Sequence, residues 1–175
     1  LNSVVYKSTQ EIFAVGEEGT LIKSTDSGLN WSKIALGGLT ESLYDIEFAS
    51  ATTGFIVGKG GLMLKTTNGG SSWEDVSLVI LEDDLFDIDF INDSSGVICG
   101  ENSVVLNTIN QGLSWQFEGM FLPITFYNAH TTITSGPLIN NITCGSNGAI
   151  ARIISTMDTS YSYLIAGTDK SINAM

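Results

Sequence analysis

The stretch Thr66-Thr-Asn-Gly-Gly-Ser-Ser-Trp73 decides the fold, because related stretches recur along the chain at equal intervals. Ser24 to Trp31 and Thr108 to Trp115 keep the same order of a hydroxyl residue, Asp or Asn, Gly and Trp. A fourth stretch, Thr156 to Tyr163, carries Ser in place of Gly and Tyr in place of Trp. A repeat of roughly 42 residues made of short apolar runs lies within the ~40–45 residues of a four-stranded propeller blade.

Each position of the repeated stretch has a physical role in a tight turn. The Asp or Asn side chain is expected to accept backbone N–H groups two residues on, in an Asx turn. The glycine supplies the positive φ of the turn, and the aromatic residue enters the next strand and wedges against the neighbouring repeat. We expect these structural roles for Ser24, Asp26, Gly28, Trp31, Thr66, Asn68, Gly70, Trp73, Thr108, Asn110, Gly112, Trp115, Asp158 and Tyr163.

The second repeat shows the predicted order of strands within a blade. Alternating apolar and acidic residues predict a first strand over 42–48, and short apolar runs predict strands over 54–57, 62–65 and 73–76. The repeated turn therefore joins the third strand to the fourth. We predict an all-β fold of about four four-stranded antiparallel blades in a single propeller domain, with boundaries near 1–38, 39–80, 81–120 and 121–170 of residues 1–175. Two alternatives stay open: the four blades close into a ring by face packing alone, or they form part of a larger propeller or assembly.

The composition limits the classes of partner. With 7 basic and 19 acidic residues the formal net charge is −12, which argues against nucleic acid and anionic membrane surfaces. No apolar run has the length of a transmembrane helix, so we expect no membrane insertion. Cys99 and Cys144 occupy positions that hold Val in other repeats, which favours buried apolar roles over a disulfide. The sequence shows no phosphate-binding loop or paired-cysteine motif, and we expect no cofactor.

The phrase Gly58-Lys-Gly-Gly-Leu-Met-Leu-Lys-Thr-Thr-Asn-Gly-Gly-Ser-Ser-Trp73 resembles the photosystem II stability and assembly factor family, whose propellers carry the Asp-box, or bacterial neuraminidase repeat. The resemblance covers about residues 2–118 and implies a β-propeller with a protein partner. In that family an Arg commonly precedes the Thr of the box and contributes to a basic patch that meets the partner. The matching positions here hold Lys23, Lys65 and Asn107. The resemblance also favours an extracytoplasmic or secreted location.

Sialidases resemble this chain in the Asp-box, but the sequence excludes their chemistry. They grip a substrate carboxylate with three arginines, whose planar guanidinium groups form bidentate bonds. This chain contains a single arginine, Arg152. Its single histidine, His130, lies among Thr and Asn residues without a plausible nucleophile, which is typical of a surface residue.

Four carboxylates share equivalent positions on the presumed first strands of two repeats: Asp45, Glu47, Asp87 and Asp89. Three interpretations of this acidic channel patch are open. It is a solvated lining of the propeller channel, a site for a hard cation such as Ca²⁺, or the carboxylate pair of an inverting glycosidase, which needs a separation of ~6.5–9.5 Å. The solvated lining is favoured, and we assign neither a catalytic nor a metal site.

These observations favour a non-enzymatic protein-binding or assembly module. The alternative is a carbohydrate-active propeller other than a sialidase, either glycan-binding or a glycoside hydrolase, on a secreted or virion surface protein. A protein partner is therefore expected, a glycan is the second candidate, and nucleic acid is not expected.

Overall fold

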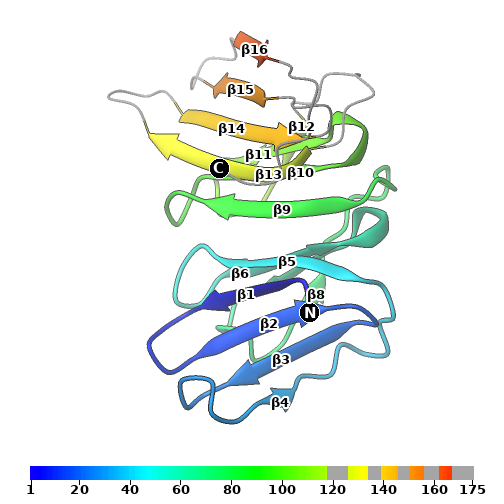
Figure 1. Cartoon of the computed structure of the whole chain (residues 1–175), viewed down its shortest axis with the longest axis vertical. Coiled ribbons are helices and arrows are strands. Elements are labelled where there is room, and N and C mark those ends of the chain that lie inside the picture. The colour runs from blue at the N-terminus through cyan, green and yellow to red at the C-terminus, as the bar shows by residue number, and fades with distance from the viewer. Residues whose placement is uncertain (118–125, 134–138, 146–149, 156–161, 167–175) are drawn as a thin grey trace. The chain divides into compact units, whose positions relative to one another are not determined.

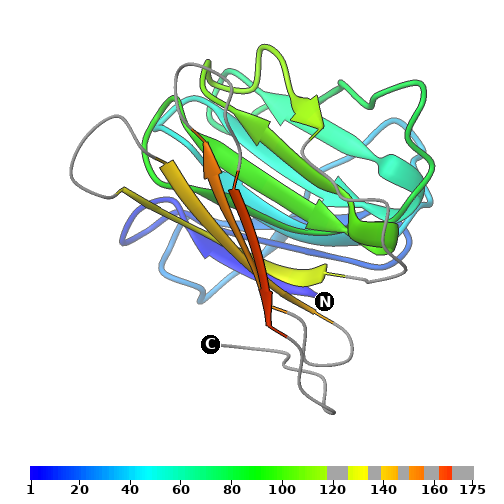
Figure 2. The same cartoon turned by 90° about the horizontal axis from the view of Figure 1, so that it is seen from above.

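The computed structural model describes residues 1–117, 126–133, 139–145, 150–155 and 162–166, with side chains described through residue 117. Its strands form four separate four-stranded sheets, shown in Figures 1 and 2, and each sheet is an antiparallel meander in chain order. The chain divides into two compact units, Leu1–Leu85 and Phe86–Met175. The predicted all-β, four-stranded blade architecture is confirmed, whereas the blade boundaries and the single domain stay predictions.

The first unit holds two complete sheets. The first sheet consists of β1 (Ser3–Tyr6), β2 (Ile12–Gly16), β3 (Thr20–Ser24) and β4 (Ser32–Lys33). The second consists of β5 (Leu43–Phe48), β6 (Gly54–Gly58), β7 (Met63–Thr66) and β8 (Glu74–Asp75), with the 3-10 turn η1 (Lys59–Gly61) between β6 and β7. The strands predicted for the second repeat are thus observed, with a fourth strand that is shorter than expected.

The third and fourth sheets follow the same plan. The third consists of β9 (Leu85–Phe90), β10 (Gly96–Gly100), the 3-10 turn η2 (Glu101–Ser103), β11 (Val105–Thr108) and β12 (Gln116–Phe117). The fourth consists of β13 (Phe126–Ile133), β14 (Ile139–Gly145), β15 (Ile150–Ser155) and β16 (Ser162–Ala166).

The second strand is fully buried in each of the three sheets whose side chains are described. Every residue of β2, β6 and β10 is buried, which explains why these strands read as continuous apolar runs between turn residues. Cys99 lies on β10 and is fully buried, as predicted. The glycines between β6 and β7 make a tight turn, in which Gly60 has a φ of 66°.

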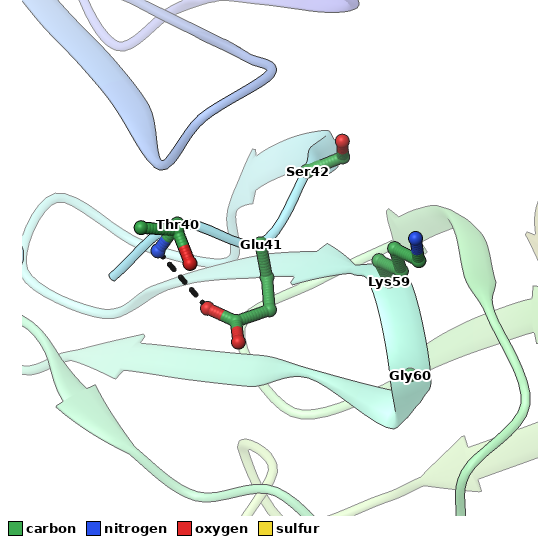
Figure 3. Close-up of a pocket in the computed structure, with 5 residues that line it drawn as sticks. All are labelled: Thr40, Glu41, Ser42, Lys59 and Gly60. Carbon is green, nitrogen blue, oxygen red and sulfur yellow. Dashed lines mark hydrogen bonds between the residues drawn. The ribbon is translucent and has the colours of Figure 1, made fainter.

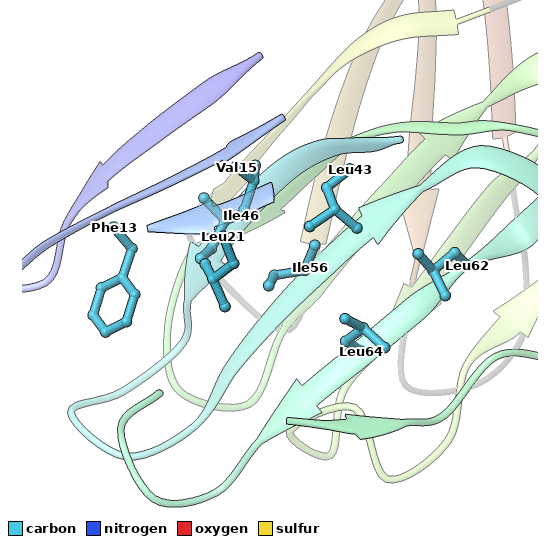
Figure 4. Close-up of a cluster of buried hydrophobic side chains, with 8 residues drawn as sticks. All are labelled: Phe13, Val15, Leu21, Leu43, Ile46, Ile56, Leu62 and Leu64. Atoms are coloured by element: carbon cyan, nitrogen blue, oxygen red, sulfur yellow. The ribbon is translucent and has the colours of Figure 1, made fainter. Parts of the chain in front are cut away.

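The core of the first unit lies between its two sheets (Figure 4). Phe13, Val15 and Leu21 come from the first sheet. They pack with buried residues of the second repeat, which are Leu43, Ile46, Ile56, Leu62 and Leu64. Because neither sheet covers its apolar face alone, burial of this cluster holds the two blades together.

Candidate functional site

The Asp-box hairpin of the second repeat is a closed hydrogen-bond network. Thr66 Oγ1 accepts the backbone N–H groups of Asn68 at 3.3 Å and Gly70 at 2.9 Å, and donates to Asn68 Oδ1 at 2.9 Å. The same Asn68 Oδ1 accepts the N–H groups of Ser71 at 3.0 Å and Ser72 at 2.9 Å. Thr66 itself is 1% exposed and its bond from Gly70 is buried, so its hydroxyl satisfies a buried backbone donor.

The first and third boxes repeat this network. In the first, the Ser24 hydroxyl accepts from the N–H groups of Asp26 and Gly28, and an Asp26 carboxylate oxygen accepts from Asn30 N–H at 2.8 Å. In the third, Thr108 and Asn110 take the same roles toward the N–H groups of Asn110, Gly112 and Ser114. Hydrogen bonds from the Asn30 side chain and backbone, and from Ser24, lower the pKa of Asp26.

One detail of the predicted turn is wrong. The Asp or Asn oxygen was expected to accept N–H groups two residues on, but in all three boxes it accepts the N–H four residues on. The N–H two residues on belongs to the box glycine and is instead accepted by the Ser or Thr hydroxyl, which also accepts the N–H of the Asp or Asn residue. The box is therefore organised around the hydroxyl, which bridges the turn, and the Asp or Asn extends the network toward the fourth strand.

The glycine of the box has the predicted backbone conformation and also a packing role. Gly28, Gly70 and Gly112 have φ values of 89°, 84° and 63°. A Cβ added to Gly70 would lie 2.6 Å from Cζ of Phe13, a fully buried residue of the first sheet. The absence of a side chain at this glycine thus lets the ring of the preceding blade approach the box.

The three tryptophans differ in their surroundings. Trp73 packs against the core cluster and meets the ring of Phe48 at 6.1 Å, and Trp115 meets Phe90 at the same distance. Trp31 is 41% exposed, and its Nε1 donates to the carbonyl of Gly28 at 3.0 Å. Of the fourth box, Asp158 lies outside the described residues, and Tyr163 lies on β16, where side chains are not described.

The positions that the family resemblance marks as basic lie on the third strands, opposite a large apolar residue of the second strand. Lys23 pairs with Phe13 and Lys65 with Phe55 in register, and their Nζ atoms lie 5.1 and 5.2 Å from those ring centroids. Burial lowers the pKa of Lys65. At the third position, Asn107 is 7% exposed.

Glu11 forms an ion pair with the lysine at the first of these basic positions, Lys23. Its carboxylate pairs with Lys23 Nζ at 2.5 Å and with Lys7 Nζ at 3.1 Å. The hydrogen bond from Lys23, followed by that from Lys7, lowers the pKa of Glu11. Lys7 also donates to the carbonyl of Gly69 at 3.1 Å, so this ion pair joins the first sheet to the box of the second.

Arg152 occupies the same register position in the fourth sheet, which the sequence reading missed. Arg152 on β15 pairs with Ile142 on β14, as Lys23 pairs with Phe13 and Lys65 with Phe55. The box alignment places Ser155 there instead, because the fourth repeat carries extra residues before its box. The constant separation between paired residues of the second and third strands is the signal that finds it.

The acidic channel patch divides between the two units. Asp45 and Glu47 lie opposite Val57 and Phe55 on the second sheet, which places both on one face, after an irregularity in register between Leu43 and Asp45. Asp87 and Asp89 lie on β9, within the second unit. Among the residues with described side chains, no group of three or more His, Cys, Asp or Glu is arranged to hold a metal ion. The favoured interpretation, a solvated lining, stays a prediction, and neither a catalytic nor a metal site is assigned.

A polar hollow of about 430 Å³ lies at one end of the second sheet (Figure 3). Its lining comprises Thr40, Glu41, Ser42, Lys59 and Gly60. The Glu41 carboxylate accepts the backbone N–H of Thr40 at 3.0 Å, and Gly60 N–H donates to Asp84 at 2.8 Å. The hollow contains none of the Asp-box or acidic channel residues.

Repeated four-stranded sheets, with Asp-box hairpins between the third and fourth strands of the first three, define a repeat protein of the β-propeller class. A family model, Photosynthesis system II assembly factor YCF48, matches residues 1–67 and 30–123. The chain belongs to this family, as the resemblance predicted. No curated protein matches the chain.

Solved structures support the fold. YCF48 bound to a D1 peptide matches with a TM-score of 0.67 at 21% identity, over 93% of this chain and 54% of that one. YCF48 from Cyanidioschyzon merolae matches with a TM-score of 0.71 at 16% identity, over 98% and 57%. A GH74 enzyme from Niastella koreensis matches with a TM-score of 0.60 at 15% identity, over 97% and 28%. The chain thus spans about half the length of the YCF48 structures.

Where the structure is described, no helix is long and apolar enough to cross a membrane.

Proposed function

We propose that the chain is a non-enzymatic protein-binding module that acts in the assembly of a larger complex. The observation that carries the proposal is the family match over residues 1–67 and 30–123. The structure of a YCF48 protein with a D1 peptide supports a peptide segment as the kind of ligand. The net charge of −12 makes nucleic acid a poor alternative.

The third strands of the first unit are the proposed contact surface, and they carry Lys23 and Lys65 at equivalent register positions. In the second unit, Asn107 and Arg152 take this register position in their own sheets. Glu11 forms an ion pair with Lys23, and Asn107 carries no charge, so these positions are less basic than the resemblance implies for the family. A ligand here is held by fewer charge contacts, and apolar and backbone contacts carry more of its affinity.

Fluorescence anisotropy with overlapping peptides of D1, each paired with a scrambled peptide of equal charge, tests the proposal. We expect saturable binding of at least one peptide over its scrambled form. Lys65→Gln should weaken it several-fold, because a partly desolvated ammonium interacts strongly with a ligand dipole or charge. Lys33→Gln is the matched control, since Lys33 is exposed on β4 and the charge change is the same. Equal binding of native and scrambled peptides would overturn the proposal.

A carbohydrate-active propeller is the second candidate, and the similarity in fold to a GH74 enzyme favours it. Its candidate catalytic carboxylates are Asp45 and Glu47 in the first unit and Asp87 and Asp89 in the second. A polysaccharide hydrolysis screen separates the two functions. Turnover by the parent that is lost in Asp87→Asn would establish the hydrolase and refute the non-enzymatic proposal.

A further inference from the structure

The second Asp-box differs from the first and third in one chemically reactive pair of residues. The two positions at the centre of each box hold Asp26-Ser27 in the first, Asn68-Gly69 in the second and Asn110-Gln111 in the third. The side-chain amide of an asparagine is open to attack by the backbone nitrogen of the next residue. A glycine at that next position offers least hindrance, because it has no Cβ. Of the three boxes, the second is therefore the most susceptible to this attack.

The folded box holds the amide group of Asn68 away from such an attack. Its Oδ1 accepts the N–H groups of Ser71 at 3.0 Å and Ser72 at 2.9 Å, and its Nδ2 donates to Ser72 Oγ at 2.8 Å. The Thr66 hydroxyl donates to the same Oδ1 at 2.9 Å. The amide cannot turn toward the nitrogen of Gly69 without losing these hydrogen bonds.

The attacking nitrogen is held as well. Gly69 is buried, and its N–H group donates to the carbonyl of Thr52 at 2.8 Å. From the first sheet, Lys7 Nζ donates to the carbonyl of Gly69 at 3.1 Å. The nitrogen must lose its hydrogen before it attacks, and a buried hydrogen bond to a protein carbonyl keeps that hydrogen from solvent base. A closed box therefore blocks the reaction, and an open box permits it.

We propose that Asn68 is a site of spontaneous deamidation whose rate is set by opening of the second box. In the open box, the deprotonated nitrogen of Gly69 bonds to Cγ of Asn68. The Cγ–Nδ2 bond then breaks, and Nδ2 leaves as ammonia after taking a proton from water. Water hydrolyses the resulting cyclic imide at either of its carbonyl groups. The reaction depends on the box alone and is independent of peptide binding.

The two products differ in their effect on the fold. Cleavage of the imide between the glycine nitrogen and Cγ gives aspartate, which the box tolerates, because Asp26 holds this position in the first box and accepts the N–H of Asn30. Cleavage at the main-chain carbonyl gives isoaspartate, which adds one methylene group to the backbone of the turn. That longer backbone displaces Gly70, whose Cα lies close to the ring of Phe13. Isoaspartate should therefore loosen the contact between the blades.

Peptide mapping by mass spectrometry of the full chain, aged in mildly alkaline buffer, tests the proposal. Enzymatic methylation of isoaspartate distinguishes the two products. Both are expected at Asn68, and they should form at least about tenfold more slowly in the native chain than in guanidinium chloride, because only the open fraction reacts. Asn110 is the internal control. It shares the hydrogen-bond network but precedes Gln111, so it should convert far more slowly than Asn68 in denaturant.

Two variants test whether box opening sets the rate. Thr66→Val removes the hydroxyl that holds Asn68 Oδ1 and should raise the native rate several-fold, whereas Thr66→Ser keeps the hydroxyl and should react like the parent. If circular dichroism shows that Thr66→Val does not fold, Lys7→Gln replaces it, because it removes the bond to the Gly69 carbonyl. Its matched control is Lys33→Gln, since Lys33 is exposed on β4.

Three results would overturn the proposal. The first is an unchanged Asn68 in the denatured chain, which would show that the pair does not react. The second is an equal rate in the native and denatured chains, which would show that the box does not protect it. The third is an equal native rate in Thr66→Val and Thr66→Ser, or in the replacement variant and its control.

Discussion

Trp73 meets Phe48 edge to face, with ring centroids 6.1 Å apart and planes inclined by 67°. Phe48 in turn lies 5.1 Å from Phe13 of the preceding blade. The tryptophan that closes the Asp-box therefore supports an aromatic contact between two blades through a residue of its own blade. Such edge and tilted contacts add to the free energy gained by burying the rings.

Trp73→Ala should lower the free energy of unfolding by about 3 kcal/mol, the lower end of the range for truncating large buried aromatic residues, because Trp73 is half-buried. Trp31→Ala is the control and should cost clearly less, since Trp31 is 41% exposed. Urea denaturation of both variants measures the difference. Equal losses would show that packing on the core cluster does not decide the role of the tryptophan.

The hydroxyl of Thr66 should be essential to the second box. Thr66→Val keeps the shape of the side chain but leaves the N–H groups of Asn68 and Gly70 without their acceptor, at a cost of about 1–3 kcal/mol. Thr66→Ser restores the hydroxyl, and Ser24 performs this role in the first box, so that variant should stay within about 1 kcal/mol of the parent. If chemical denaturation gave Thr66→Val the same free energy of unfolding as Thr66→Ser, the hydroxyl-centred network would be contradicted.

Glu11 should make stability depend on pH in the acid range. Its ion pairs with Lys23 and Lys7 lower its pKa in the folded chain below the ordinary 4.5. The unfolded chain therefore binds a proton first, so the contribution is fully present above pH 4.5 and is lost as the pH falls through the lower folded pKa.

Glu11→Gln should accordingly lose about 1 kcal/mol or less at neutral pH, as expected for partly exposed pairs, and should show a shallower decline in acid. Glu17→Gln, at an exposed carboxylate, is the control and should follow the parent. Urea midpoints measured from neutral pH down to the acid range provide the comparison. A parallel decline of the parent and Glu11→Gln would refute the ion-pair assignment.

Calcium should have little effect on folding. Asp45 and Asp87 have Ser3 as their counterpart in the first repeat, and Glu47 and Asp89 have Val5, so no complete ring of carboxylates exists. We expect weak, non-specific binding and a melting temperature that changes little in millimolar Ca²⁺. A rise of many degrees that a chelator reverses would establish a metal site.

The local repeats predict much of the fold. The spacing of Trp31, Trp73 and Trp115 predicts the blades, and the glycines predict the turns, because both depend on residues near one another in sequence. The pairing of Glu11 with Lys7 and Lys23 was not predicted, since it depends on how the hairpins of the first sheet bring their ends together.

The fourth repeat shows where sequence alignment and strand register diverge. Alignment on the box puts Ser155 at the position of Lys23, whereas pairing with Ile142 puts Arg152 there. Extra residues between the hairpin turn and the box shift the alignment on the box relative to the strand register. The sequence alone does not say which of the two gives the position equivalent to Lys23.

Assignment of the Asp-boxes to blade packing is tested most directly by a double-mutant cycle between Gly70 and Phe13. Gly70→Ala should cost about 3 kcal/mol, since overpacking adds to an unfavourable φ. Gly60→Ala is the control: its φ is 66°, an added Cβ meets nothing within 4 Å, and about 1 kcal/mol is expected. Phe13→Leu should relieve part of the clash. The double variant should therefore lose less free energy of unfolding than the two single variants together, by over ~1 kcal/mol. Equal losses for Gly70→Ala and Gly60→Ala, with additivity within about 0.5 kcal/mol, would contradict the packing role.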